Sequence, residues 1–412
     1  MTKHVVFIVE NQAAPHDVRV WTEALTIKKM GYNVSIISRQ NEKVKEKFEC
    51  VAGIDIYRHP LPIDKNSILG YSLEYLSAFI WETILCLRLF LKKRFQFIHS
   101  ANPPDHIFLI ALFFKIFGVK YIFDHHDLTP ELFLTKSSKK NKIIYRILIG
   151  MEKLSCKVAD AVISSNNSYK QLVVRRHKIS PKKVFVVRND PVLSDYESSE
   201  DGVEKDKNGF KVLLYIGSIN HQDGVDILIQ AIRHLINEFN EERFICYIVG
   251  DGESLKSLKE LAANLGLNKH INFTGFIYDK KVILGYLKLA DICLESAPYN
   301  ELNRHSTFIK IMQYMAVGKP IVAFRLTETV NSAKGAAIFI DPGDVIGFSK
   351  AIKTLMDDEE LRVRLGKAGI TRVRQELNWE KASHMLRDAY EYLESDEDDK
   401  QGKEGNERFS RI

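Results

Sequence analysis

The amino-acid sequence predicts an α/β protein made of two Rossmann-like, doubly wound domains that face each other across a cleft. Apolar strand-like segments alternate with helical segments, which is typical of parallel sheets covered by helices. This alternation runs twice, and 412 residues suit two domains of about 100–200 residues each. Ligands of such sheets bind outside the carboxyl ends of the strands, so we expect the site in the loops that follow strands.

The first series of strands and helices predicts one domain over residues 1–193. Helical patterns at 16–30, 70–94, 105–117 and 143–158 separate its strands. The strands are HVVFIVE, NVSIIS, FQFIHS, KYIFDHH and AVISS.

A polar stretch at 194–208 predicts the boundary between the domains. Its sequence, SDYESSEDGVEKDKN, is charged and nearly free of large apolar side chains, as linkers are. A second domain is expected over 209–376. Its strands are KVLLYIG, FICYIVG, INFTG, ADICLES, PIVAF and AIFID.

The C-terminal segment predicts a helix followed by a tail. We expect 377–393, which Trp379 leads, to pack back toward the first domain as a helix. Residues 394–412 are highly charged and poor in apolar groups, which predicts disorder. The acidic run DEDD in this tail is expected to be solvated and not a metal site.

Composition excludes a disordered or membrane-embedded chain, because 45% of the residues are hydrophobic and 27% are charged. The net charge of +6 suits phosphates or an acidic membrane surface without requiring either, and no nucleic-acid partner is expected. Five scattered cysteines without metal-ligand spacing predict buried thiols in a cytoplasmic protein and no metal site. Charged residues interrupt the apolar segments 68–91 and 107–123 before about 18 uncharged residues accumulate, so neither is expected to span a bilayer.

Two glycine-containing loops in the second half offer phosphate sites. In YIGSINHQDGVDILIQAI a strand ends at Gly217, and Gly224 opens an amphipathic helix whose first amides can bind an anion. The next strand ends in YIVGDGESLKSL, where Gly250 and Gly252 flank Asp251. A simple strand-to-helix turn is the alternative for either loop.

The segment YNELNRHSTFIKIMQYMAVGKPIVAF carries the most information. Ser306 and Thr307 are predicted to cap a helix, Lys310 to lie beside a diphosphate, and Gln313 to bind a ribose hydroxyl. A capped amphipathic helix that only packs in the core is the alternative.

Taken in order, these motifs resemble retaining glycosyltransferases of the GT-B fold in family four, also called glycosyl transferases group 1. The resemblance covers almost the whole chain and extends to a subgroup whose donor-site helix starts STxxKI and continues (E/Q)YMAxGKP. Its motifs here are SANPPD, IFDHHDLTPEL, YIG with QDGVD, VGDG, NFTGF, ADICL, STFIKIMQYMAVGKPIV and SAKGAAIFIDPGD.

The resemblance implies roles for individual residues. His126 and Asp127, in the loop after a first-domain strand, are expected near the transferred sugar as catalytic residues. The substrate implied is a nucleotide-diphosphate sugar, with a UDP-sugar favoured, and no cofactor or metal is expected. The donor-binding positions implied are Gly217, Ser218, Gly224, Gly250, Asp251, Gly252, Phe276, Ser306, Thr307, Lys310, Ile311 and Gln313.

Several positions depart from the family pattern. His305 and Gln313 stand where many members have glutamates, and Ser218 and Asp223 stand where many have an arginine and a lysine. Few fixed cations would then face the diphosphate. A non-catalytic binding subunit and a nucleotide-sugar epimerase on the same fold are therefore the alternatives to a transferase.

The acceptor side is less specified. In ENQAAPHDVRVWTEA, Asp17 and Arg19 are expected either to face the acceptor or simply to begin a helix. The apolar, basic-flanked region 84–97 suits contact with a membrane that carries a lipid-linked acceptor; a core helix with a snorkelling basic end is the alternative. The function expected is transfer of a hexosyl or N-acetylhexosaminyl unit, with retention, to a glycan or lipid-linked acceptor of the cell surface. We expect the protein in the cytoplasm, with peripheral contact at the inner face of the membrane.

Overall fold

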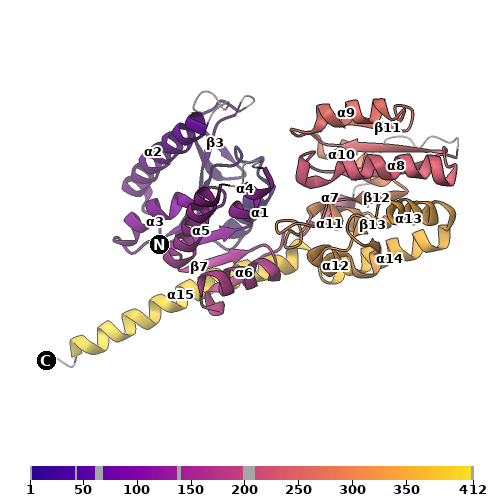
Figure 1. Ribbon diagram of the computed structural model, residues 1–412. Helices are drawn as coiled ribbons and strands as arrows, with labels where there is room; N and C mark the ends of the chain where they lie inside the picture. Colours follow the sequence, from indigo (N-terminus) through magenta and orange to yellow (C-terminus); the bar gives the residue numbers. More distant parts are fainter. Residues whose placement is uncertain (1, 42–43, 61–67, 137–140, 198–208, 410–412) are drawn as a thin grey trace. The chain divides into compact units, whose positions relative to one another are not determined.

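The computed structural model describes residues 2–41, 44–60, 68–136, 141–197 and 209–409 and divides the chain into two compact units (Figure 1). Unit 1 comprises Met1–Val187 and Ala382–Ile412, and unit 2 comprises Arg188–Lys381. The division falls just before the predicted linker at 194–208. The first part of that stretch forms the short helix α7 (Ser194–Glu197), and the rest lies outside the described residues.

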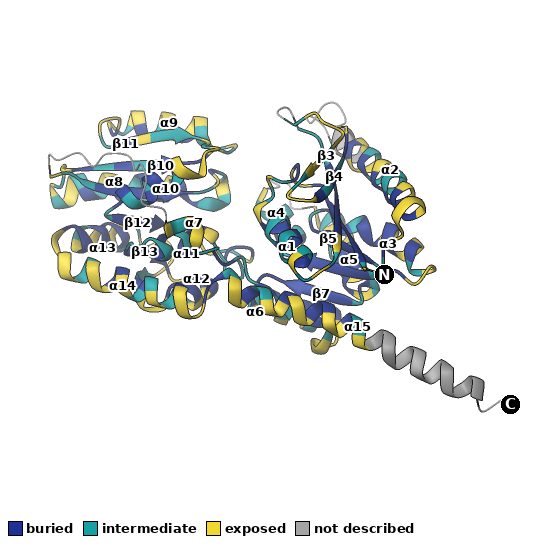
Figure 2. Cartoon of the chain, turned by 180° about the vertical axis from the view of Figure 1, so that it is seen from behind, coloured by how far each residue is buried: buried dark blue, intermediate teal, exposed yellow. Residues whose placement is uncertain are grey.

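Unit 1 is built on an eight-stranded sheet with the order β3-β4-β2-β1-β5-β6-β7-β8. All neighbouring strands are parallel except β3 and β4. Every residue of β1 is buried, as expected where helices cover both faces of a parallel sheet (Figure 2). The strands are β1 (His4–Val9), β2 (Asn33–Arg39), β3 (Phe48–Val51), β4 (Ile54–His59), β5 (Phe97–Ala101), β6 (Lys120–His125), β7 (Ala161–Ser164) and β8 (Val184–Val186).

Seven helices of the described chain accompany this sheet. They are α1 (Val18–Lys29), α2 (Ile68–Lys93), α3 (Phe108–Lys115), α4 (Thr129–Lys136), α5 (Lys142–Val158), α6 (Asn167–His177) and α15 (Trp379–Phe409). Helix α15 is tied to unit 1 through the buried Tyr390, whose hydroxyl lies 3.0 Å from Nδ1 of His99. The sequence predicts the end of this helix at 393 and disorder beyond it, whereas α15 runs to Phe409. A docked helix extends at low cost, because each added residue contributes one backbone hydrogen bond.

Unit 2 is built on six parallel strands in the order β11-β10-β9-β12-β13-β14. Alternate residues of β9 serve opposite faces: Leu213 and Tyr215 pack with α8, α9 and α13, whereas Leu214 and Ile216 pack with α10 and α11. The strands are β9 (Lys211–Ile216), β10 (Phe244–Val249), β11 (Ile271–Gly275), β12 (Ile292–Glu295), β13 (Ile321–Phe324) and β14 (Ala337–Ile340).

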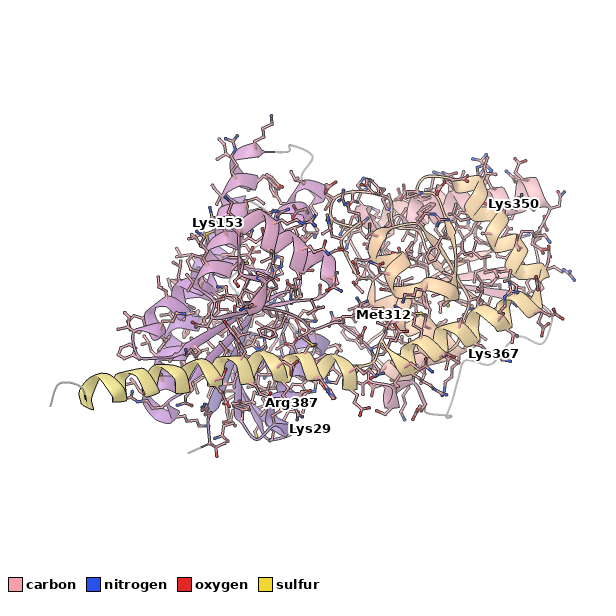
Figure 3. All side chains as sticks on the ribbon, turned by 90° about the horizontal axis from the view of Figure 1, so that it is seen from below. Lys29, Lys153, Met312, Lys350, Lys367 and Arg387 are labelled. Atoms are coloured by element: carbon pink, nitrogen blue, oxygen red, sulfur yellow. The ribbon has the colours of Figure 1, made fainter. Side chains whose placement is uncertain are left out.

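The helices of unit 2 lie on both faces of its sheet. Met312 of α11 is fully buried, while Lys350 of α13 and Lys367 of α14 project from the surface (Figure 3). The helices are α8 (Val225–Phe239), α9 (Leu255–Asn264), α10 (Lys280–Leu289), α11 (Ile309–Ala316), α12 (Thr327–Ala333), α13 (Val345–Asp357) and α14 (Glu359–Gln375), besides α7. The prediction of two doubly wound α/β domains is thus confirmed for each unit.

No helix among the described residues combines the length and the apolar character needed to cross a bilayer.

Candidate active site

The carboxyl ends of β9 and β12 mark the point in unit 2 where the chain reverses its direction across the sheet. From β9 the chain adds β10 and β11 on one side and then returns to place β12 on the other. The loops at such a point leave in opposite directions and make room for a ligand. Gly217 follows β9 and Ser296 follows β12, so their loops frame the candidate donor site.

Glycine is required where these loops touch. Gly224 has φ +68°, and a Cβ there would lie 2.1 Å from the carbonyl oxygen of Ser296. A Cβ on Gly250 would lie 1.8 Å from the carbonyl oxygen of Gly217. Any side chain would push the loops apart. Of the four glycines that the sequence singles out, Gly250 and Gly252 thus lie against the loop that begins at Gly217, and Gly224 lies against the loop after β12.

Several amides of these loops are already used inside unit 2. The amides of Gly217 and Gly250 donate to carbonyl oxygens of neighbouring strands at 3.0 and 3.1 Å. The amide of Gly252 donates to Oδ1 of the exposed Asp251 at 2.7 Å. Ser218 is exposed, and its amide has no acceptor among the described residues. Of the predicted phosphate amides in these loops, Ser218 is thus the best placed to serve a ligand.

Helix α11 begins later than the sequence predicts. Its N-cap is Phe308, which offers no side-chain acceptor. The predicted caps Ser306 and Thr307 lie before the helix start, and the hydroxyl of Ser306 instead donates to the carbonyl oxygen of Leu302 at 2.8 Å. The capping prediction is therefore wrong, because the preceding turn uses that hydroxyl. The N-cap Phe308 gives the first-turn amides of α11 no side-chain acceptor, and a helix start of this kind can bind an anion.

Lys310 lies at the centre of the candidate donor site. Its Nζ is 2.9 Å from Oε2 of Glu295, at the end of β12, and 3.0 Å from the hydroxyl of Tyr215 on β9. A Cβ on Gly217 would lie 2.9 Å from Cε of Lys310, so this side chain packs directly on the loop after β9. Burial lowers the pKa of Lys310, but the charges of Glu295, Tyr314 and Asp223 and the hydrogen bond to Glu295 together outweigh it, so the net shift is upward. Lys310 is therefore a fixed cation.

The cation is matched by more than one carboxylate. Asp223 accepts the amide of Asn220 at 2.9 Å and lies within electrostatic reach of Lys310. Burial raises the pKa of Asp223, an effect that the charge of Lys310 opposes. A diphosphate at Lys310 would thus meet the carboxylates of both Asp223 and Glu295. The two carboxylates offset the positive charge of Lys310, so the site attracts an anion less strongly than an unpaired lysine would.

The three other residues predicted to bind the donor, Gln313, Ile311 and Phe276, lie in different environments. Gln313 is half-buried and lies near the hydroxyl of Tyr196 in α7, and the side chain of Ile311 is fully buried in the core. Phe276 is 58% exposed after β11, and its ring meets that of Tyr278 edge-on at 4.4 Å. Of these three, Phe276 alone presents its side chain largely to solvent.

In unit 1 a buried ion pair stands at the carboxyl end of β6. Arg19 of α1 binds Asp124 with two parallel bonds, Nε to Oδ2 and NH2 to Oδ1, each 2.7 Å. Nδ1 of His126 lies 3.1 Å from the same Oδ2. The side chain of Arg19 is 4% exposed and that of Asp124 is fully buried, whereas that of His126 is 12% exposed. Of these three groups, His126 is thus the one a ligand can reach.

Asp124 controls the charge of His126. Burial lowers the pKa of His126, but Asp124 raises it more, to about 9. The pKa of Asp124 lies well below its ordinary value: burial raises it, and the charges of Arg19 and His126 outweigh that effect. At neutral pH the pair is an imidazolium held by a carboxylate, so His126 can donate hydrogen bonds but cannot accept a proton.

The loop that carries His126 is clamped by Asn102 of the SANPPD motif. Oδ1 of Asn102 accepts the amides of His126 and Asp127 at 2.9 and 3.0 Å, and its Nδ2 donates to the carbonyl oxygen of Asp127 at 2.8 Å. The two motifs that the sequence places near the reaction centre are therefore physically joined.

Asp17 and Arg19, the two residues predicted to face the acceptor, both have partners inside unit 1. Asp17 is the N-cap of α1 and accepts the amide of Val20 at 3.0 Å. Arg19 is held by Asp124 and by the carbonyl oxygen of Val187 at 3.0 Å. Both positions thus have the helix-starting role that the sequence left open as the alternative, and their contact with an acceptor stays a prediction.

A hollow of about 470 Å³ lies elsewhere on unit 2, lined by residues of β10, α9 and β11 that include Tyr247, Lys259 and Phe273. None of the predicted site residues lines it. The strand ends and α11 carry the chemistry, so we assign the candidate site to them.

Comparison with known protein families accounts for most of the chain. Residues 17–189 match the family model "Glycosyltransferase Family 4", and residues 198–372 match "Glycosyl transferases group 1". Each half of the chain thus matches a glycosyltransferase family model, and the fold is the GT-B fold.

Relatives and solved structures agree with this GT-B assignment. An uncharacterized glycosyltransferase of Methanocaldococcus jannaschii is 28% identical over 63% of this chain and 65% of its own length. A lipopolysaccharide core biosynthesis glycosyltransferase of Rhizobium meliloti is 28% identical over 43% of this chain and 48% of its own. The chain thus spans about half to two thirds of the length of these relatives. Anabaena HepE, solved in complex with UDP, has a similar fold, with a TM-score of 0.68 and 14% identity over 95% of this chain and 100% of the other.

Sequence reasoning missed three residues that organise the candidate sites, two of them in unit 1 and one in unit 2. Asp124 stands inside the quoted motif IFDHHD, and Asn102 stands inside SANPPD, but no motif position marks either as a partner of the His126 loop. Glu295 ends the apolar strand ICLE, and a carboxylate inside such a buried run was the available signal.

Proposed function

We propose that the protein transfers a hexosyl or N-acetylhexosaminyl unit from a nucleotide-diphosphate sugar, with UDP as the favoured carrier, to a glycan or lipid-linked acceptor. The observation that carries this proposal is Lys310, a buried cation packed on Gly217 beside the uncapped start of α11. Departure of the diphosphate develops negative charge, which a helix start and a fixed ammonium stabilise. The UDP complex of Anabaena HepE supports the choice of nucleotide.

In this proposal the diphosphate lies at the first turn of α11, and its negative charge competes with Glu295 for Lys310. The amide of Ser218 supplies a further donor, and the exposed ring of Phe276 offers a surface for the base. His126, as an imidazolium, donates a hydrogen bond to the transferred sugar and has no role as a base. Attack from the face that the diphosphate leaves would retain the anomeric configuration, which the family resemblance supports.

The acceptor is proposed to belong to cell-surface polysaccharide synthesis, in line with the relative named for lipopolysaccharide core biosynthesis. The protein would work in the cytoplasm at the inner face of the membrane. An exposed apolar surface of unit 1 supports membrane contact, with Leu91 82% and Ile116 79% exposed at the ends of α2 and α3. Lys92 and Lys93 lie exposed beside it, as suits anionic headgroups. Phe90 and Phe117 join the two helix ends, with ring centroids 5.5 Å apart.

The test is turnover over a panel of UDP-, GDP- and ADP-sugars, with products identified by mass spectrometry. We expect release of a nucleoside diphosphate with one class of donor and a large loss of rate in His126→Ala. Nucleotide binding without release in the presence of a glycan acceptor mixture would favour the non-catalytic binding subunit. Conversion of the sugar without any acceptor would favour the epimerase.

A further inference from the structure

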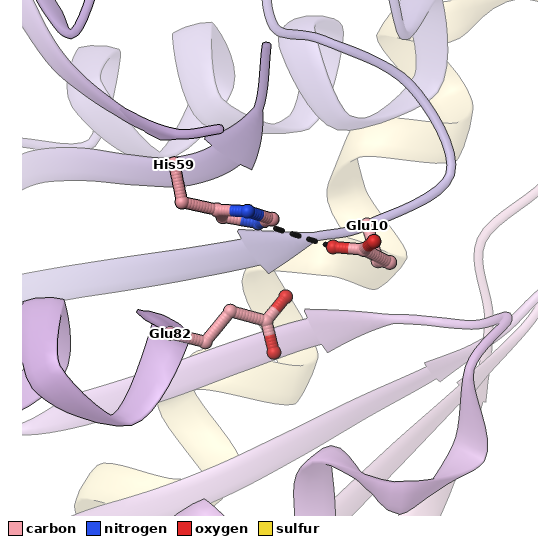
Figure 4. A group of neighbouring side chains, drawn as sticks. All are labelled: Glu10, His59 and Glu82. Carbon is pink, nitrogen blue, oxygen red and sulfur yellow. Dashed lines mark ion pairs between the residues drawn. The ribbon is translucent and has the colours of Figure 1, made fainter. Parts of the chain in front are cut away.

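Three buried polar side chains converge in unit 1, apart from the residues assigned to transfer. Glu10 directly follows β1, His59 ends β4, and Glu82 lies on α2, which packs over this part of the sheet (Figure 4). Glu10 and His59 are 4% and 1% exposed, and Glu82 is completely buried. One ligand atom from each lies within 4.8 Å of the others.

The group is short of hydrogen-bond donors. Within the described part of the chain, neither carboxylate oxygen of Glu82 has a hydrogen-bond donor, and the one contact of Glu10 Oε2 is that of 3.1 Å with Nε2 of His59. Burial raises the pKa of Glu82 well above its ordinary value, and Glu10 raises it further. A buried carboxylate without a partner requires either a proton or a cation to be tolerated in the fold.

The orientation of His59 favours a cation. Its Nδ1 lies 3.2 Å from the carbonyl oxygen of Pro60, which accepts the Nδ1–H. In the neutral ring this leaves Nε2 as a lone pair directed at Glu10. Histidines that bind metals are commonly held in this way, with the second ring nitrogen donating to a backbone carbonyl.

We propose that Glu10, His59 and Glu82 form a structural site for a divalent cation of the zinc class. One imidazole nitrogen and two carboxylates are a donor set that zinc accepts, at about 2.0–2.2 Å from each ligand atom. Around one ion such atoms lie about 3–4 Å apart, so a small contraction of the present group is enough. The cation offsets the charges of both carboxylates and ties α2 to the ends of β1 and β4. No step of sugar transfer passes through it.

The experiment uses the full-length protein stripped with a chelator and titrated with Zn²⁺ in competition with a chromophoric chelator. Adventitious binding by the exposed Cys50 is removed with Cys50→Ser in every sample of this titration. We expect about one tight site per chain, a higher Tm with Zn²⁺ and at least about a tenfold loss of affinity in Glu82→Gln and His59→Gln. Glu74→Gln is the matched control on the same helix, since Glu74 pairs with Arg39 at 3.5 Å outside the group, and its Zn²⁺ affinity should not change.

A second readout does not depend on the folding of any variant. Co²⁺ bound to the unmodified protein should give visible absorption bands. Addition of about one Zn²⁺ per chain should abolish these bands by displacing the Co²⁺. Absence of such a site overturns the proposal, as does equal Zn²⁺ affinity in Glu74→Gln and Glu82→Gln. In either case the carboxyl groups of Glu10 and Glu82 share a proton instead.

Discussion

Nζ of Lys310 lies 2.9 Å from Oε2 of Glu295, so the fixed cation of the proposed donor site is already paired inside the protein. The partners come from α11 and β12, and both are almost fully buried. An incoming diphosphate has to share or replace this carboxylate. The pair therefore sets how tightly a nucleotide can bind.

Removal of the carboxylate should strengthen nucleotide binding. In Glu295→Gln the amide oxygen can still accept a bond from Lys310, but the negative charge that repels a diphosphate is gone. We expect the Kd for UDP to fall by roughly three- to tenfold, measured by calorimetry. A higher Kd in the folded variant would show that Glu295 positions Lys310 more than it competes with the ligand.

Removal of the cation should have the opposite effect. Lys310→Met keeps the apolar stem but lacks the charge, and we expect at least about a tenfold weaker Kd for UDP. The exposed Lys350 on α13 is the control, and Lys350→Met should bind UDP like the unmodified protein. Equal Kd values in the two variants would remove Lys310 from the donor site.

The charge of His126 predicts a pH dependence of stability. The pKa of this histidine is about 9 in the fold, above its ordinary value of 6.5. Its contribution is therefore fully present below about pH 6.5 and is lost as the pH rises through about 9, and it amounts to at most about 3 kcal/mol. These pKa values define a window of about pH 6 to 9.5. Urea unfolding across this window should show a steeper loss of the free energy of unfolding for the unmodified protein than for His126→Gln.

Glu23 complicates this window and makes the comparison of variants necessary. Burial raises the pKa of Glu23 to about 8, so the fold keeps a proton that the unfolded chain has already released, and stability also falls as the pH rises toward about 8. Glu23 is present in both proteins, so both have this slope, but the charge of His126 lowers the pKa of Glu23 and the slope extends to higher pH in His126→Gln. Identical pH profiles would mean that His126 is neutral in the fold.

The ion pair of Arg19 and Asp124 should be a major stabilising element of unit 1. Arg19→Met leaves Asp124 buried without its two short bonds, which we expect to lower the free energy of unfolding by about 3–5 kcal/mol in a urea titration. The exposed pair of Arg325 and Asp341 gives the comparison, and Arg325→Met should cost less than about 1 kcal/mol. Similar costs would contradict the buried geometry of Arg19.

Membrane contact through α2 and α3 predicts binding to anionic vesicles. The double variant Leu91→Asp with Ile116→Asp replaces two exposed apolar side chains, so it should leave the fold intact and reduce co-sedimentation with phosphatidylglycerol vesicles by at least about fivefold. Ile346→Asp on unit 2, where Ile346 is 57% exposed, is the matched control. Equal loss in both variants would assign binding to nonspecific apolar contact.

The sequence was sufficient to predict both α/β domains, because the apolar strands such as KVLLYIG alternate regularly with helices. It also placed Lys310 and the glycine loops, since these lie next to strand ends in the chain. The capping prediction for Ser306 failed because the preceding turn takes up its hydroxyl, a local competition that residue preferences do not reveal.

Partners that are distant in the chain could not be predicted. Arg19 and Asp124 are 105 positions apart, and Glu295 meets Lys310 only because side chains of α11 reach the end of β12, where Tyr314 also donates to the carbonyl oxygen of Leu294. The pairing of buried charges follows from the completed fold and not from spacing. The proposed cation site could not be predicted from the sequence for the same reason, since its ligands Glu10, His59 and Glu82 come from three separate parts of the chain.

Hydrogen exchange by mass spectrometry with and without UDP tests the central claim most directly. We predict slower exchange of the amides at the start of α11 and at Ser218 when UDP is bound, with this protection lost in Lys310→Met. Protection confined to the hollow beside Tyr247 and Lys259, with no change at α11, would contradict it.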